Sequence, residues 1–117
     1  MKRILKVLCV VFALFFTLNN AFAYDYTEVR AEHILVKTKA EAVNLENKIE
    51  NGENFETLAK KYSMCPSGQR GGDLGYFSRG QMVQPFENTA FDMAIGEVSE
   101  PIQTQYGWHI IKVLDKR

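Results

Sequence analysis

The chain has 117 residues, enough for one ordinary domain, and its 14 basic and 14 acidic side chains give a formal net charge of zero. Without residues 1–23, 11 basic and 14 acidic residues remain, and the charge is −3. A weakly acidic domain lacks the positive surface that nucleic acid or an anionic membrane would require, so we exclude both as its partners.

Residues 1–23 have the pattern of a secretory signal peptide. Three basic residues precede an apolar stretch from 7 to 16, and the small-x-small sequence Ala21-Phe22-Ala23 follows it. The stretch is too short for a membrane-spanning helix, which needs about 20 residues, although an uncleaved N-terminal anchor is the alternative. Cleavage after Ala23 leaves a single domain over 24–117.

The first half of this domain is predicted to contain one strand and two helices. The strand spans 30–36, after a short lead-in. Thr38 and Glu41 have the spacing of a capping box, in which the Thr hydroxyl accepts a helix N–H and the Glu reaches back, so a helix should run to about residue 51. Asn54 can cap a second helix, whose buried stripe is Phe55, Leu58, Ala59 and Tyr62.

The second half is predicted to complete a sheet. Residues 63–72 are rich in turn formers and should be irregular, and a strand follows over 73–78. Pro85 suits the first turn of a third helix. A short strand over 101–104 and a long one over 108–114 form a hairpin around 105–107. This order predicts an α+β domain with helices packed around a small, mostly antiparallel sheet.

Two histidines, His33 and His109, lie in the most apolar predicted strands, and the chain contains no others. Apolar strands occupy the middle of a sheet, so we predict that the first and last strands are side by side and the imidazoles are neighbours. One histidine on an apolar strand usually has a structural role, but two that meet favour a functional site. With Cys65, they would lie beside an apolar pocket suited to chemistry on an apolar substrate.

The chain has two cysteines. Cys9 lies inside the apolar stretch of the signal peptide, with no small residue before it, so we reject lipidation. Cys65 is then alone in the domain, which can form no internal disulfide. Its neighbours mark a loop, which argues against an inert core residue. A nucleophile paired with a histidine and a polar group that tunes the site without a covalent bond both remain open.

The sequence argues against two other kinds of site, a zinc site and a phosphate-binding loop. Zinc held by His33, Cys65 and His109 would need spacings of 32 and 44 residues, which match no compact metal motif, and no fourth ligand stands out. Glycines 71, 72, 75 and 80 resemble a phosphate loop, but no helix starts at the right place after them and no Gly-Lys-Ser/Thr is present. We expect these glycines to allow turns and close packing, and we expect neither a metal nor a cofactor.

Six ordered motifs carry a family resemblance from about Val29 to the C-terminus. They are His33-Ile34-Leu35-Val36, Cys65-Pro66-Ser67-Gly68, Arg70-Gly71-Gly72-Asp73-Leu74-Gly75, Ser78-Arg79-Gly80-Gln81-Met82-Val83, Pro85-Phe86-Glu87 and Gly107-Trp108-His109-Ile110-Ile111. The chain closely resembles the parvulin-type peptidyl-prolyl isomerases. The resemblance implies the parvulin (FKBP-like) α+β fold, a four-stranded antiparallel sheet flanked by helices, and cis/trans isomerisation of Xaa-Pro bonds.

The resemblance also implies a role for each site residue. The paired central histidines are His33 and His109, Cys65 fills a position where parvulins carry Cys or Asp, and Thr104 is a polar group linked to the histidines. The proline pocket is formed by Leu74, Met82 and Phe86, and Tyr106, which stands where some relatives have Ser, joins the substrate contacts. Since Asp replaces Cys in the family, we predict that Cys65 acts by electrostatics or hydrogen bonding.

The expected partners follow from one difference between this chain and the phosphate-directed parvulins, and from the signal peptide. Phosphate-directed parvulins carry an arginine cluster after the first strand, where this chain has only Lys37-Thr38-Lys39, so we predict no requirement for phosphorylation before proline. We expect a periplasmic monomer that acts on proline-containing, unfolded or partly folded exported polypeptides and meets the membrane only through the signal peptide. The alternatives are a non-catalytic peptide-binding holdase on the same fold and a thiol hydrolase.

Overall fold

The computed structural model describes residues 26–117, so the predicted signal peptide lies outside the described residues. The elements in chain order are β1 (Glu28–Val36), α2 (Lys39–Glu50), α3 (Phe55–Tyr62), a 3₁₀-helix (Pro66–Arg70), β2 (Asp73–Ser78), α4 (Gln84–Asp92), β3 (Ile102–Thr104) and β4 (Gly107–Lys116). The four strands form one antiparallel sheet in the order β2-β1-β4-β3. The predicted α+β architecture is confirmed, with the first and last strands in the middle of the sheet.

The helices begin where the sequence signals place them. Thr38 Oγ1 accepts the Glu41 backbone N–H at the start of α2, and the structure contains only this half of the predicted capping box. Asn54 Oδ1 accepts the Thr57 N–H at the start of α3. Pro85 lies in the first turn of α4, where its missing N–H has no partner to lose. Among the described residues, no helix is long and apolar enough to span a bilayer.

Two local predictions are wrong. Tyr62 does not complete the buried stripe of α3, since its side chain is 40% exposed. It is the last residue of the helix, and there a tyrosine keeps its hydroxyl in water at little cost. The segment 63–72 is not wholly irregular, because Pro66 starts a 3₁₀-helix that ends at Gly71 in a left-handed conformation (φ 70°).

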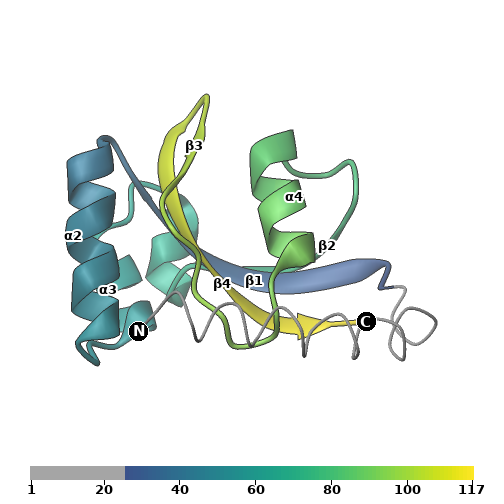
Figure 1. Cartoon of the computed structure of the whole chain (residues 1–117), viewed down its shortest axis with the longest axis horizontal. Coiled ribbons are helices and arrows are strands. Elements are labelled where there is room, and N and C mark those ends of the chain that lie inside the picture. Colours follow the sequence, from purple (N-terminus) through teal and green to yellow (C-terminus); the bar gives the residue numbers. More distant parts are fainter. Residues whose placement is uncertain (1–25) are drawn as a thin grey trace, which may run out of the picture.

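The two faces of the sheet support two separate cores, because alternate residues of a strand point to opposite faces. One face packs against α4 through Val29, Ala31, Ile111 and Val113, together with Phe77, Phe86, Ala90 and Met93. The other packs against α2 and α3 through Ile34, Val36 and Ile110. Figure 1 shows α2 and α3 together at one end of the molecule and α4 standing apart from them. His33 and His109 belong to the α4 face by the same alternation.

The pairing of β1 with β4 sets the relation between the histidines. His33 is opposite Ile111 and Leu35 is opposite His109, so the imidazoles occupy diagonal positions on one face. β3 joins β4 through a tight hairpin in which Thr104 pairs with Gly107. The hairpin therefore brings Thr104 beside the histidines, as the predicted turn at 105–107 requires.

Candidate active site

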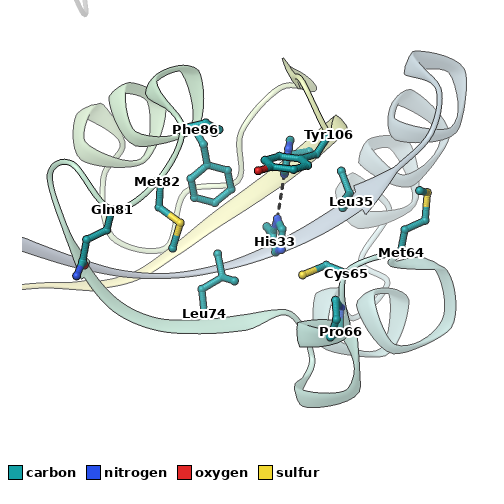
Figure 2. A pocket seen from close by; sticks show the side chains of 12 residues that line it. His33, Leu35, Met64, Cys65, Pro66, Leu74, Gln81, Met82, Phe86 and Tyr106 are labelled. Atoms are coloured by element: carbon teal, nitrogen blue, oxygen red, sulfur yellow. Dashed lines mark hydrogen bonds between the residues drawn. The ribbon is translucent and has the colours of Figure 1, made fainter.

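A cavity of about 440 Å³ opens over the α4 face of the sheet. Seven of the eight predicted site residues line it, namely His33, Cys65, Leu74, Met82, Phe86, Tyr106 and His109. The eighth, Thr104, lies behind His109. Figure 2 shows His33 at the centre, with Leu74, Met82 and Phe86 on one side and Leu35, Met64, Cys65 and Pro66 on the other. The fold thus brings together residues from β1, β2, α4, β4 and the loops between them.

The two imidazoles meet through their Nδ1 atoms, which are 3.0 Å apart. Both side chains are buried, and the rings are nearly parallel, with centroids 5.2 Å apart. The Phe86 ring packs edge-on against both, at centroid distances of 5.5 and 5.3 Å. A contact between two Nδ1 atoms is a hydrogen bond only when one carries a hydrogen and the other does not.

The hydrogen bonds continue beyond His109. Its Nε2 lies 2.7 Å from Thr104 Oγ1, which also accepts the Tyr106 backbone N–H at 3.1 Å. At the other end, His33 Nε2 is buried and has no partner among the described residues. The protonation of the two rings and the direction of the Thr104 hydroxyl are therefore linked in one chain.

Both histidines are neutral at physiological pH. Burial, together with the smaller effect of the neighbouring His109, lowers the pKa of His33 to about 4. Burial alone lowers the pKa of His109 to about 4. Two neutral rings satisfy the requirement for one donor and one acceptor at the Nδ1 contact.

Cys65 is half-buried at the start of the 3₁₀-helix. Its Sγ accepts a hydrogen bond from the Ser67 hydroxyl at 3.2 Å, and its backbone N–H donates to Ser63 Oγ at 3.3 Å. Ser63 Oγ also accepts the Leu35 N–H, which ties this loop to β1. In the described part of the chain the hydrogen bonds of the thiol include neither histidine, so no base is paired with it as a nucleophile would require.

Five lining residues were not predicted: Leu35, Met64, Pro66, Gln81 and Val83. Leu35 is two positions after His33 on the same strand, so strand alternation would have identified it. Met64 is 57% exposed and follows a helix end, and no periodic signal marks it. With Tyr106, which is 61% exposed, it extends the apolar wall of the cavity toward solvent.

Gly72 supports the site by close approach. Its φ is +89°, and a Cβ on it would lie 2.3 Å from the His33 carbonyl oxygen. The Gly72 carbonyl accepts the His33 N–H at 3.0 Å, so this glycine lets the loop pack directly on β1. Packing rather than phosphate binding explains its place in the sequence. Over residues 26–117, no group of three or more His, Cys, Asp or Glu side chains is arranged to hold a metal ion.

Comparison with known proteins assigns the chain to a family. The model of the PPIC-type PPIase domain matches residues 16–117. The chain belongs to this family. It is 51% identical over 90 residues to the foldase protein PrsA of Geobacillus kaustophilus, a match that covers 76% of this chain and 32% of the relative. It is 50% identical over 91 residues to PrsA of Bacillus subtilis, covering 77% and 31%. The chain thus spans about a third of the length of these curated relatives.

Solved structures agree with this assignment. The crystal structure of PrsA from Bacillus subtilis matches with a TM-score of 0.76 and 50% identity, covering 78% of this chain and 36% of that one. The parvuline of Nitrosopumilus maritimus matches with a TM-score of 0.71 and 43% identity, covering 79% of this chain and all of the other. The predicted parvulin fold is confirmed, and the chain carries an isomerase domain of this type.

Proposed function

We propose that this domain accelerates the isomerisation of Xaa-Pro bonds in unphosphorylated, unfolded segments of exported proteins, without a covalent intermediate. The observation that carries the proposal is a buried, neutral histidine pair at the floor of an apolar cavity. Rotation about an Xaa-Pro bond faces a barrier of about 18–20 kcal/mol set by amide resonance and takes tens to hundreds of seconds unaided. A site that favours the twisted amide lowers this barrier with no bond broken.

The apolar wall would hold the proline ring. Leu74, Met82 and Phe86 present one leucine, one flexible thioether and one aromatic ring around the cavity. Methionine adapts to irregular shapes, so the same wall accepts the ring in both isomers and in the twisted form between them. A thousandfold acceleration requires that the twisted form be bound about 4 kcal/mol more tightly than the planar isomers.

The hydrogen-bonded side chains His33, His109 and Thr104 would stabilise the twisted amide. Twisting removes the amide resonance and so changes the charge on the carbonyl oxygen and on the nitrogen. If His109 donates at the Nδ1 contact, its Nε2 accepts from the Thr104 hydroxyl, and His33 carries its hydrogen on Nε2. If His33 donates, both outer positions reverse. The pair therefore presents fixed dipoles that need little reorganisation during the reaction, and the Cys65 thiol adds a further polar group at the same floor.

The absence of a phosphate requirement is supported by the two lysines after β1. Lys39 Nζ lies 5.6 Å from the centroid of the Trp108 ring, and like Lys37 it offers a point charge and no guanidinium. A point charge lacks the bidentate geometry that an arginine gives to a phosphate. An apolar or neutral residue before proline fits the cavity mouth better than a phosphorylated one.

An extracytoplasmic place of action is supported by the signal-peptide pattern and by one structural comparison. One solved chain, described with a pair of structurally related SurA-like chaperones of Campylobacter jejuni of which one is called periplasmic, matches with a TM-score of 0.75 and 33% identity, covering 87% of this chain and 44% of that one. We propose a periplasmic or cell-surface location, where newly exported polypeptides are the available proline-containing substrates.

The proposal is tested by following cis/trans isomerisation in a panel of Xaa-Pro peptides, with and without phosphorylation. We expect acceleration on unphosphorylated peptides, reduced by His33→Ala and by Leu74→Ala. A folded protein that binds the peptides but accelerates none of them would refute catalysis and leave the holdase alternative. Holdase action alone would suppress aggregation of an unfolded protein equally well after the His33→Ala change.

A further inference from the structure

Three of the twelve residues that line the cavity stand on a single loop rather than on a strand or helix. The loop over 79–83 joins β2 to α4, and Gln81, Met82 and Val83 from it line the cavity. Gly80 gives it a sharp turn, with φ of +93°. Met82 and Val83 pack against the core at the end of the loop, but residues 79–81 at the turn are exposed, so hydrogen bonds rather than apolar burial fix the turn itself.

Glu87 supplies the central restraint on this loop. It lies in the first turn of α4, only 8% exposed, which is unusual for a charged residue. Its Oε1 accepts the Gly80 backbone N–H at 2.5 Å, and its own N–H donates to the Val83 carbonyl at 3.0 Å. One residue therefore binds the loop near both of its ends, with Met82 between them.

The other contacts of the loop do not hold the Gly80 backbone against α4. Gln81 Oε1 accepts the Ser78 N–H at 2.8 Å, which holds the loop to β2 but not to the helix. Arg79 Nη1 is 3.7 Å from Glu87 Oε2, but its side chain is 60% exposed and such a pair contributes little. The Arg79 guanidinium also lies over the ring of Phe91 on α4, 4.2 Å from its centroid, but this contact does not reach the Gly80 backbone. Among the described residues, the Glu87 carboxylate is the side-chain group of α4 that accepts a backbone N–H of the turn.

We propose that Glu87 is a positioning residue for substrate binding. By holding Gly80 against α4, it fixes the gap between Met82 on the loop and Phe86 on the helix, across which the proline ring is gripped. Glu87 does not line the cavity, so it acts through Met82 and not on the substrate. This inference rests on the proposed function, because it takes the cavity to be the proline site.

The test compares Glu87→Ala with Glu87→Gln, which keeps an oxygen at the Oε1 position. For an unphosphorylated Xaa-Pro peptide, we expect Glu87→Ala to raise KM about tenfold, because the change removes one hydrogen bond to a charged group. The kcat should stay unchanged within about twofold. Glu87→Gln should restore KM to near the wild-type value. The matched control is Glu97→Ala, which also removes a carboxylate that accepts a backbone N–H, that of Ala94, but away from the cavity.

A second measurement separates positioning from folding. The methyl signal of Met82 in NMR spectra should shift or broaden in Glu87→Ala, while the imidazole signals of His33 and His109 stay where they are. If Glu87→Ala does not fold, Glu87→Asp, whose shorter side chain cannot reach Gly80, should show the same changes.

Three outcomes would overturn the inference: an unchanged KM, a loss confined to kcat, or a rise in KM that Glu97→Ala reproduces. If the wild-type protein accelerates no peptide, the proposed function fails on its own. The Glu87 inference is then judged by peptide affinity, which should still fall in Glu87→Ala and recover in Glu87→Gln.

Discussion

His33 and His109 bond to each other from diagonal positions of two paired strands, with Nδ1 atoms 3.0 Å apart. Diagonal neighbours on one face of a sheet are about 7–8 Å apart, a distance that ring side chains can span. The two rings are nearly parallel, at an interplanar angle of 19°, and Phe86 packs against both. This arrangement buries both rings and keeps them neutral, which leads to the first prediction.

Activity should be independent of pH across the range in which ordinary histidines titrate. Burial lowers the pKa of both histidines to about 4, so neither imidazole changes its protonation between about pH 5.5 and 8, and the rate should fall only near pH 4. The rate of peptide isomerisation against pH measures this directly. A midpoint near 6.5 in the rate, or in the imidazole NMR signals, would contradict it.

The same shifts predict how stability depends on pH. The folded-state pKa of each histidine lies below its unfolded value of about 6.5, so the unfolded chain binds more protons between about pH 4 and 6.5. The free energy of unfolding should therefore be fully present above pH 6.5 and fall as the pH drops toward 4. Urea unfolding at a series of pH values tests this, and His109→Asn, which cannot titrate, should show a weaker decline.

The parts of the fold that the sequence predicts are those encoded by periodicity and by local signals. Alternation in β1 and β4 and the caps at Thr38 and Asn54 report contacts between residues that are near in the chain. The meeting of His33 with His109 was predictable because the most apolar strands must be central.

The missed features depend on tertiary contacts that no local pattern carries. Ser67, buried beside Cys65, and Met64 at the cavity mouth come from a loop whose path is set by Gly72 packing on β1. Glu32 is a stronger case, because a glutamate between apolar residues of a strand indicates a solvent-exposed position, whereas its side chain is only 6% exposed.

Cys65→Ala should slow catalysis without unfolding the domain. The thiol is a polar group at the cavity floor that accepts from Ser67, so its loss should lower kcat about tenfold to a hundredfold while peptide binding persists. Cys65→Asp should restore part of the rate, since a carboxylate can replace a polar group but not an attacking thiol. Complete loss of activity in Cys65→Ala, together with a trapped thioester-like adduct in the wild type, would reverse this interpretation.

Thr104→Val should disturb the histidine pair from outside the cavity. The change removes the hydroxyl at 2.7 Å from His109 Nε2 and leaves the Tyr106 N–H without its acceptor. We expect a lower kcat and a loss of about 1 kcal/mol in the free energy of unfolding. Thr104→Ser keeps the hydroxyl and should behave like the wild type in both measurements. A Thr104→Val protein that keeps wild-type kcat would show that the hydroxyl does not act through His109.

Substitutions of two wall residues, Phe86 and Leu74, should affect peptide binding and stability to different extents. Phe86 is 2% exposed and contacts both histidines, so Phe86→Ala should cost about 3–5 kcal/mol of stability and serves poorly as a probe of function. Leu74 is only half-buried, so Leu74→Ala should raise KM with a much smaller loss of stability. Kinetics and thermal unfolding on the two variants check the contrast, which fails if Leu74→Ala unfolds the domain or leaves KM unchanged.

Glu32→Gln should stabilise the protein at alkaline pH. Glu32 points to the sheet face opposite His33. Burial and its hydrogen bond with Glu56 raise the pKa of Glu32 well above the usual range. The charge of Asp73 raises it further, whereas Lys112, which pairs with Glu56, lowers it. A raised folded-state pKa means that the folded chain binds the extra proton, so this contribution is present below about pH 4.3 and is lost as the pH rises through the folded value.

A glutamine imitates the protonated carboxyl at every pH, so Glu32→Gln should remove this loss. The expected gain is about 1 kcal/mol at roughly pH 9 and little at roughly pH 5, measured by urea unfolding. Glu41→Gln, on the exposed side of α2, is the matched control and should show no such trend. A gain of the same size at both pH values would mean that the glutamine acts through packing and that Glu32 carries no proton in the folded protein.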